Sequence, residues 1–258
     1  MPMRAERREE LKAVYVQARA CTRCPELART RTQVVFGAGN ADADLMFVGE
    51  APGAREDEQG LPFVGAAGKL LDELLGEVGL ARADVFIANV LKCRPPGNRD
   101  PQSAEIDNCR EFLMRQVELI EPRIICTLGN FATKLLRGEP AAPLLVTTNL
   151  GGGTFATKRV RGEPTGISRL HGQAEIRVLG SRAVRLYPLF HPAAALYTRS
   201  LLDTMRADFA RLPELLALPL PEQPERAAPA VPEPSPTPAP GPAPAPEPGS
   251  DQLGLFED

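Results

Sequence analysis

Short apolar runs alternate with segments of helical periodicity between residues 44 and 212, and this alternation restricts the fold more than any other feature. The runs with the length and apolar content of buried strands span 44–49, 85–91, 123–129 and 183–190. The segments with helical spacing, or with an Asp-Pro start typical of helices, span 66–79, 100–120 and 199–212. Strands that alternate with helices predict a three-layer α/β/α fold around a central, mostly parallel four-stranded sheet. In such sheets ligands bind at the carboxyl ends of the strands.

The C-terminal part of the chain has a composition that does not support a folded core. Residues 219–249 hold 13 of the 27 prolines. Such a stretch cannot keep a helix or a sheet ladder, and it favours an extended polyproline II linker. We therefore expect a folded domain at 1–216, a proline-rich linker at 217–249 and a short terminal peptide at 250–258.

The composition also limits where the protein acts and what it binds. No apolar run of about 18 residues occurs, so no segment is expected to span a membrane. The first 20 residues are charged throughout and lack the apolar core of a secretory signal. We therefore expect a monomer in the reducing cytoplasm, associated with the nucleoid. Residues 214–258 hold eight of the 33 acidic residues and one of the 30 basic residues, so the rest of the chain is mildly basic and permits a polyanionic ligand.

Five cysteines in a chain expected to meet a reducing environment favour a metal site or core packing over disulfides. Cys126 lies within an apolar strand and is interpreted as a core residue. The other four, Cys21, Cys24, Cys93 and Cys109, can supply four thiolates to one site. Zn²⁺ and a [4Fe–4S] cluster both accept that donor set. Because only one pair is closely spaced, the pattern favours a cluster that clamps the N-terminal segment onto the body, while zinc and the lack of any metal stay open.

Several motifs occur together that are weak singly and specific jointly. They are Cys-Thr-Arg-Cys at 21–24, Gly-Glu-Ala-Pro-Gly at 49–53, Pro-Phe-Val-Gly at 62–65, Asn-Val-Leu-Lys-Cys-Arg-Pro-Pro-Gly-Asn-Arg-Asp-Pro at 89–101 and His-Pro-Ala at 191–193. With these motifs in this order, the sequence resembles the family 4 uracil-DNA glycosylases, the iron–sulfur branch of their superfamily. The resemblance implies a uracil-DNA glycosylase of base excision repair, with a [4Fe–4S] cluster on the same four cysteines.

The resemblance also implies a pocket for the target base. A glycosylase flips its target base out of the stack and reads the Watson–Crick edge. The carboxamide of Asn89 matches the O4 acceptor and the N3 donor of uracil, and an oriented amide would reject cytosine. Phe63 is expected to stack on the flipped base. Ala51 and Asn98 are expected to line the same pocket.

Cleavage of the glycosidic bond requires further groups. Negative charge develops on O2 of the leaving uracil, and His191 is expected to donate a hydrogen bond to that oxygen. Glu50 or Glu56 is expected to orient or deprotonate the attacking water and to stabilise the sugar cation, and the sequence leaves the choice open. The neighbouring Asp57 and Glu58 are interpreted as a solvated charge run.

Basic residues near these motifs are candidates for contacts with DNA phosphates. They are Lys92, Arg94, Arg99 and Arg199. His171, the other histidine of the chain, is expected to face solvent or phosphate. The loop at 97–101 carries no histidine where a related branch of the superfamily captures uracil-DNA covalently, so we expect turnover.

The terminal peptide and two rival functions complete the expectations. Gln252, Leu253, Leu255 and Phe256 resemble the pentapeptide that binds the bacterial sliding clamp, and the linker would hold the enzyme near that clamp. The rivals are a sister-family glycosylase that acts on other deaminated bases and a non-catalytic iron–sulfur adaptor that binds DNA or the clamp. Glu50 argues against the first, and the set of Glu50, Asn89 and His191 argues against the second.

Overall fold

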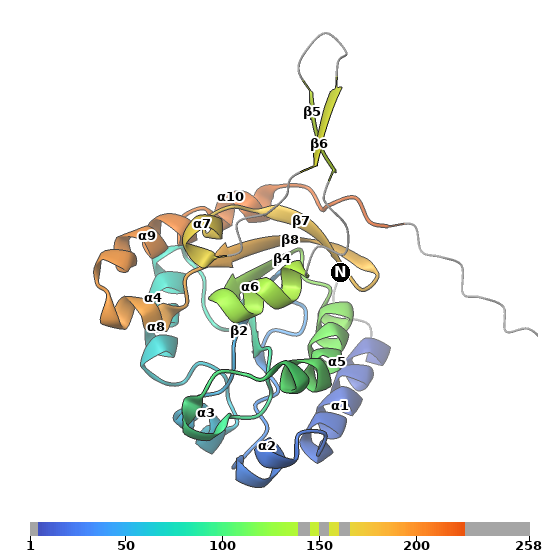
Figure 1. Ribbon diagram of the computed structural model, residues 1–258, viewed down its shortest axis with the longest axis vertical. Helices are drawn as coiled ribbons and strands as arrows, with labels where there is room; N and C mark the ends of the chain where they lie inside the picture. The colour runs from blue at the N-terminus through green and yellow to red at the C-terminus, as the bar shows by residue number, and fades with distance from the viewer. Residues whose placement is uncertain (1–4, 139–144, 150–154, 160–165, 225–258) are drawn as a thin grey trace, which may run out of the picture. The chain divides into compact units, whose positions relative to one another are not determined.

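The structure of the protein is a computed structural model that describes residues 5–138, 145–149, 155–159 and 166–224 (Figure 1). The chain divides into two compact units, Met1–Pro224 and Glu225–Asp258. The second unit lies outside the described residues, and with it most of the predicted linker and the whole predicted clamp-binding peptide. No helix in the described part of the chain is long and apolar enough to cross a membrane.

A six-stranded sheet forms the centre of the first unit, in the order β1-β3-β2-β4-β8-β7. Its inner strands run parallel and are β3 (Phe86–Asn89), β2 (Leu45–Gly49), β4 (Ile124–Leu128) and β8 (Arg182–Leu189). These are the four predicted strands, so the mostly parallel α/β sheet is confirmed. β1 (Ala38–Gly39) and β7 (Glu175–Leu179) add antiparallel edges that were not predicted. A separate antiparallel pair is formed by β5 (Leu145–Asn149) and β6 (Phe155–Arg159).

Helices cover both faces of the large sheet. One face packs against α1 (Ala5–Ala20), α5 (Ser103–Ile120) and α6 (Asn130–Arg137), and the other against α4 (Ala66–Glu77), α8 (Pro192–Tyr197), α9 (Ser200–Phe209) and α10 (Leu212–Ala217). The short helices in the connections are α2 (Pro25–Thr30), α3 (Ala54–Gln59), α7 (Ile167–Leu170) and the 3-10 turn η1 (Pro96–Asn98). The three-layer arrangement follows directly from the alternation of strands and helices.

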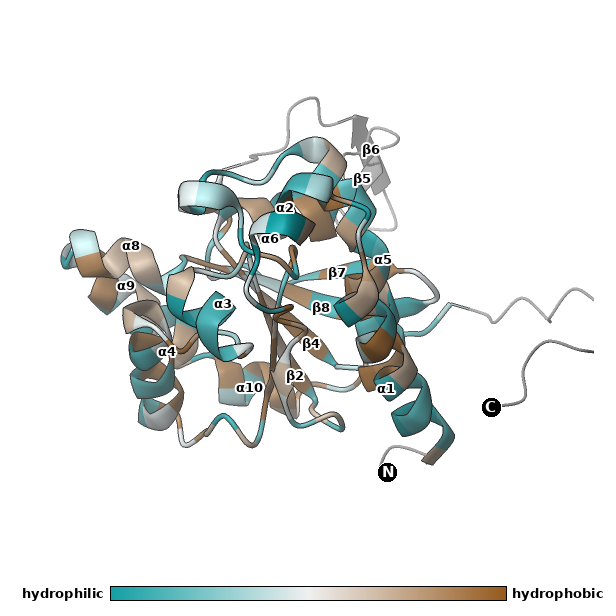
Figure 2. Ribbon diagram, turned by 90° about the horizontal axis from the view of Figure 1, so that it is seen from below, coloured by the Kyte–Doolittle hydropathy of each residue, from teal (hydrophilic) through white to brown (hydrophobic). Residues whose placement is uncertain are grey.

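Alternating side chains of the central strands supply the two halves of the core. Met46 and Val48 of β2 pack on the α1 and α5 side, while Leu45 and Phe47 pack on the α4 and α9 side. The ring of Phe47 stacks on that of Phe209, with centroids 5.9 Å apart. Figure 2 shows β2 and β4 as largely hydrophobic, and hydrophilic residues on helices such as α1 and α4. A strand that is apolar on both faces therefore has to lie in the middle layer.

The parallel register brings the polar motifs to one edge of the sheet. Gly49 at the end of β2 pairs with Asn89 at the end of β3, and Leu128 at the end of β4 pairs with Leu189 at the end of β8. Glu50 follows β2 directly, and His191 follows β8 after one residue. The carboxyl edge of the sheet therefore gathers residues that are far apart in the sequence.

Candidate active site and cysteine centre

A cleft of about 410 Å³ opens at the carboxyl edge of the sheet. All the residues predicted to bind substrate or to act in catalysis line it, namely Glu50, Ala51, Glu56, Phe63, Asn89, Asn98 and His191. Arg99 lines it as well. This volume suits a small planar ligand such as a single base.

Asn89 places a carboxamide at the back of this cleft. The residue is 2% exposed, and its Oδ1 atom is buried without a hydrogen-bond partner. Gly49 leaves the space that this oxygen occupies, because a Cβ atom at position 49 would lie 2.4 Å from it. Since buried polar atoms are nearly always paired, an unpartnered acceptor at the wall of a cleft indicates a ligand that brings a donor.

Phe63 adopts a backbone conformation that few residues other than glycine take up. Its φ is 53°, in the left-handed region. Arg82 holds this turn by donating hydrogen bonds to the carbonyl groups of Pro62 and Phe63. The Phe63 ring lies 5.5 Å from the His191 ring between centroids, at an interplanar angle of 28°. The turn therefore directs the aromatic face toward the histidine that closes the other side of the cleft.

His191 is the N-cap of α8, and its hydrogen bond fixes the tautomer. The backbone N–H of Ala193 donates to Nδ1 over 3.1 Å, so the proton of the neutral ring belongs on Nε2. Burial lowers the pKa of His191 to about 4, against a smaller opposing effect of Glu56. The imidazole is therefore neutral near pH 7 and offers one N–H donor to the cleft.

The two candidate carboxylates are held differently. Glu56 accepts hydrogen bonds from the backbone N–H groups of Val64 and Gly65 at 2.9 and 2.8 Å, at the N-terminus of α4. Glu50 has no side-chain hydrogen bond to any described residue, and burial, with a smaller contribution from the charge of Asp100, raises its pKa. Glu56 is thus committed to the backbone, whereas Glu50 is free to contact a water molecule.

Two of the charged residues interpreted from the sequence as exposed are buried, and those predictions were wrong. Lys92 is 1% exposed, because the chain after β3 passes beneath α5, so it does not reach a DNA phosphate in this structure. Asp57 is 3% exposed and accepts hydrogen bonds from the backbone of Thr32, whereas Glu58 is exposed as predicted.

The remaining predicted DNA contacts lie near the cleft or on the surface. Arg94 donates to Asn98 Oδ1 over 2.7 Å, and Arg99 forms ion pairs with Glu105 and Glu26. Arg199 is exposed at the N-cap of α9.

His171 does not simply face solvent. Its Nδ1 lies 2.8 Å from Asp208 Oδ2, and its ring centroid lies 4.6 Å from that of Phe190. The side chain remains 26% exposed, so the expectation that it faces solvent or phosphate missed the contact with Asp208 of α9 but is not contradicted.

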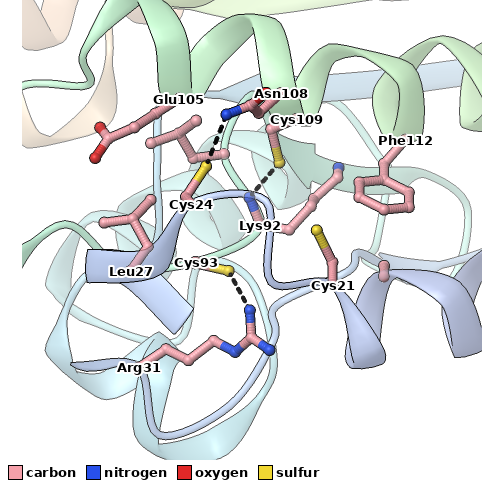
Figure 3. A pocket seen from close by; sticks show the side chains of 12 residues that line it. Cys21, Cys24, Leu27, Arg31, Lys92, Cys93, Glu105, Asn108, Cys109 and Phe112 are labelled. Atoms are coloured by element: carbon pink, nitrogen blue, oxygen red, sulfur yellow. Dashed lines mark hydrogen bonds between the residues drawn. The ribbon is translucent and has the colours of Figure 1, made fainter. Parts of the chain in front are cut away.

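The four cysteines predicted as ligands surround one cavity (Figure 3). Cys21 and Cys24 lie between α1 and α2, Cys93 follows β3, and Cys109 lies on α5. Cys126 is buried in β4, away from the cavity, which confirms it as a core residue. Three distant segments of the chain thus place their sulfur atoms around the same space.

Each of these sulfur atoms has a nitrogen donor beside it, which the sequence analysis did not anticipate. The backbone N–H of Lys92 donates to Cys109 Sγ over 3.2 Å, Arg31 to Cys93 Sγ over 3.2 Å, and Asn108 to Cys24 Sγ over 3.6 Å. Arg23 contacts Cys21. Four thiols with such donors fit a centre of metal-bound thiolates, since N–H groups around the sulfur atoms stabilise the charged ligands.

The fold and the cleft define an α/β enzyme that binds a small ligand at the carboxyl edge of its parallel sheet, with a separate cysteine centre at one flank. Comparison with known proteins makes the family specific. The family model described as the uracil DNA glycosylase superfamily matches residues 36–215. The chain therefore belongs to the uracil-DNA glycosylase superfamily.

Individual relatives agree with this assignment. The chain is 41% identical over 208 residues to the Type-4 uracil-DNA glycosylase of Archaeoglobus fulgidus. The aligned residues make up 80% of this chain and 94% of that protein. It is 39% identical over 212 residues to the Type-4 uracil-DNA glycosylase of Sulfurisphaera tokodaii, covering 82% and 87%. It is 32% identical over 142 residues to the Type-5 uracil-DNA glycosylase of Pyrobaculum aerophilum, covering 43% and 62%.

Proposed function

We propose that the protein hydrolyses the bond between uracil and deoxyribose in DNA and leaves an abasic site for base excision repair. The observation that carries this proposal is the buried, unpartnered Oδ1 of Asn89 at the wall of the cleft. Membership of the superfamily and the similarity to proteins named Type-4 uracil-DNA glycosylase support it.

Recognition of uracil follows from the donor and acceptor pattern of its edge. Asn89 Oδ1 accepts the N3 hydrogen of uracil, and the amide nitrogen donates to O4. Cytosine has an acceptor at N3 and a donor at its amino group, so it leaves both groups of Asn89 mismatched. Phe63 packs on the flipped base, and Ala51 and Asn98 close the pocket around it.

Departure of the base is assisted by a neutral donor. The Nε2 hydrogen of His191 bonds to O2 of uracil, where negative charge grows as the glycosidic bond breaks. A neutral imidazole stabilises this anion without first transferring its proton, and the lowered pKa of His191 keeps the ring in that form. Loss of one such donor reduces turnover by about a hundredfold to a thousandfold.

We assign activation of the attacking water to Glu50. Its carboxylate borders the cleft and carries no hydrogen bond to the described residues, whereas Glu56 already accepts two backbone N–H groups. Glu50 therefore orients the water, accepts its proton and stabilises the positive charge on the sugar. Glu56 acts as a positioning residue for the 62–65 turn.

We also propose a [4Fe–4S] cluster on Cys21, Cys24, Cys93 and Cys109. The four thiols line one cavity and come from three separate segments, a distribution that favours a cluster over the two closely spaced cysteine pairs of a typical zinc ribbon. The similarity to proteins named Type-4 uracil-DNA glycosylase supports the same choice. The cluster, when bound, supplies structural cross-linking, and base removal uses the residues of the cleft alone.

An oligonucleotide with a single uracil tests the proposed activity. Full-length protein is incubated with this substrate, and alkali then cleaves the strand at any abasic site. We expect cleavage with wild-type protein, a large loss with Asn89→Ala or His191→Ala, and full activity with Asn40→Ala, which lies outside the cleft. Wild-type protein with its full iron content that leaves the strand intact would refute the proposal.

The same assay separates the two rivals. A non-catalytic adaptor would retain the uracil oligonucleotide in a gel shift and give no alkali-sensitive product. A sister-family enzyme would cleave a hypoxanthine oligonucleotide at least as fast as the uracil one. Selective cleavage at uracil excludes both.

A further proposal concerns the terminal peptide with Gln252, Leu253, Leu255 and Phe256, which we infer binds a bacterial sliding clamp. It rests on the sequence pattern alone. A pull-down that compares the full chain with a chain ending at residue 249 tests it. Equal retention of the clamp by both would remove the proposal, without affecting the glycosylase assignment.

A further inference from the structure

Lys92 carries an ammonium group in the interior, between the cleft and the cysteine centre. Its Nζ atom donates to the backbone carbonyl of Asn89 over 2.9 Å and to Gln116 Oε1 over 2.6 Å. No Asp or Glu of the described part of the chain forms a salt bridge with it. Its other recorded contact is the ring of Phe36, whose centroid lies 5.8 Å from Nζ. A buried cation held by neutral groups is costly to desolvate, so the fold gains something specific from keeping it there.

The first of these contacts lies directly behind the proposed base reader. Asn89 is the last residue of β3 and pairs with Gly49 of β2. Its carbonyl oxygen is held by Lys92, while its carboxamide oxygen lies against Gly49 at the wall of the cleft. Fixing the peptide group on one side of the Cα atom restricts where the side chain on the other side can point.

The contact with Gln116 ties Lys92 to α5, the helix that also carries Cys109 of the cysteine centre. The backbone N–H of Lys92 donates to Cys109 Sγ, and the next residue in the chain is Cys93. Gln116 and Cys109 lie on the same face of α5, since they are separated by about two turns of helix. Gln116 itself is fully buried and donates from Nε2 to the carbonyl of Phe36 over 2.9 Å. Lys92 is thus bound to α5 at two points: its backbone N–H contacts Cys109, and its ammonium group contacts Gln116.

We propose that Lys92 is a positioning residue that holds Asn89 for uracil and connects its position to the cysteine centre. The proposal rests on the base-reading role proposed above for Asn89. The Lys92 ammonium fixes the end of β3 relative to α5, and α5 is fixed relative to the centre by Cys109. Base recognition therefore depends on a side chain that no substrate atom touches.

Substitutions at both ends of the link test this role in the full-length protein with its metal centre loaded. Lys92→Met removes the ammonium and keeps the length of the side chain. Gln116→Leu removes the acceptor, whereas Gln116→Glu keeps it. Lys134→Met, on the exposed side of α6, serves as the control for loss of a lysine. Iron content and visible absorbance are measured for every variant.

The decisive readout is binding of the base compared with binding of DNA without it. We expect Lys92→Met and Gln116→Leu to weaken inhibition by free uracil and to lower kcat/KM on uracil-DNA by about tenfold to a hundredfold. Affinity for DNA with an abasic site should stay within about twofold of wild type, because that ligand makes no contact with Asn89. Gln116→Glu should bind uracil more tightly than Gln116→Leu, and Lys134→Met should match wild type.

Several results would overturn the inference. Wild-type inhibition by uracil in an iron-loaded Lys92→Met protein would do so, as would equal losses of affinity for uracil and for abasic DNA, which indicate a general structural role. If Lys92→Met fails to load iron, Gln116→Leu decides by the same criteria, since Gln116 forms no hydrogen bond to a cysteine among the described residues. If Asn89→Ala also retains wild-type inhibition by uracil, the assignment of Asn89 as the base reader has failed, and not the link alone.

Discussion

At the scale of single residues, the fit between Gly49 and its neighbours decides what the cleft can hold. A Cβ atom at position 49 would lie 2.4 Å from Asn89 Oδ1 and 2.7 Å from the ring of Phe63. Both neighbours are nearly fully buried, so neither can retreat without disturbing the core. The absence of a side chain at this position therefore preserves the arrangement of the amide and the aromatic ring.

We predict that Gly49→Ala nearly abolishes excision of uracil. The added methyl group displaces the carboxamide of Asn89, the ring of Phe63, or both, and a displacement of about 1 Å can cost a hundredfold in rate. The measurement is kcat/KM on a uracil oligonucleotide. Gly76→Ala is the matched control, because a Cβ atom there meets nothing within 4 Å and alanine favours the interior of α4 by about 0.5–1 kcal/mol. Equal activity of the two variants would contradict the prediction.

The pH dependence of the reaction should report the ionisation of Glu50. Burial raises the pKa of Glu50 above its usual value of 4.5, and the carboxylate form is the one that accepts a proton from water. Activity should therefore fall as the pH decreases through this raised pKa. His191, with a pKa of about 4, is already neutral over most of that range. Glu50→Gln should remove this acid limb from a profile of kcat/KM against pH, and a Glu50→Gln enzyme with an unchanged acid limb would exclude Glu50 as the group responsible.

Sequence patterns found the residues of the cleft but not those that hold them. Glu50, Asn89 and His191 each stand at or just after the end of a strand, and parallel strands bring such ends together. Lys92 and Asp57 were misassigned because a charged residue is usually exposed, and only the packing of α5 and the 32–33 backbone makes them internal. Arg31, Arg82 and Gln116 act through contacts with residues far away in the sequence, so no local pattern identifies them.

At the scale of elements, the connection between α3 and α4 shows how a helix terminus supports the site. The N-cap of α4 is Gly65, which has no side chain to accept the first N–H groups of the helix. Glu56 of α3 instead accepts from the N–H groups of Gly65 itself and of Val64 just before it. One carboxylate thereby joins two helices and fixes the turn that carries Phe63.

We predict that Glu56→Ala destabilises the protein by about 1–3 kcal/mol, because the N–H groups of Val64 and Gly65 lose their acceptor. The free energy of unfolding from denaturant titration measures this loss. Glu58→Ala is the control, since Glu58 is an exposed neighbour on the same helix and should change stability by less than about 0.5 kcal/mol. Unchanged stability of Glu56→Ala together with a complete loss of activity would instead make Glu56 the residue that activates water.

The strands that the sequence did not reveal lack the continuous apolar run of a buried strand. β1 has only two residues, and β7 alternates charged and apolar residues, with Ile176 and Val178 exposed and Glu175 and Arg177 half-buried. Edge strands bury little apolar surface, so their residues need not be apolar. The inner strands were predicted because each is buried on both faces, which requires a continuous apolar run.

At the scale of the first unit, the proposed cysteine centre would join the segment with α1 and α2 to the segments that carry Cys93 and Cys109. α1 meets α5 through the buried Val14 and Ala18 and through ion pairs at the surface, including Arg115 with Glu10. Exposed ion pairs add little stability, so we expect the ligands of the proposed centre to add to the apolar packing that holds α1 and α2. The opposite face, with α4 and α9, has its own hydrophobic cluster and contains no ligand cysteine.

Removal of the metal should therefore loosen one flank of the unit before the sheet unfolds. Cys21 and Cys24 lose their link to Cys93 and Cys109, so the segment with α1 and α2 is then held by side-chain packing and hydrogen bonds alone. Burial raises the pKa of the Cys109 thiol to about 11, which favours its neutral form once the metal is gone. After chelation of iron, or in Cys21→Ser/Cys24→Ser, we expect faster hydrogen exchange and tryptic cleavage within residues 5–31, while β4 stays protected. Cys126→Ala should keep its iron and its protection at 5–31, since Cys126 lies in the core and not at the centre. Uniform loss of protection across β4 and the N-terminal helices would show that the centre supports the whole unit as one cooperative structure, contrary to this prediction.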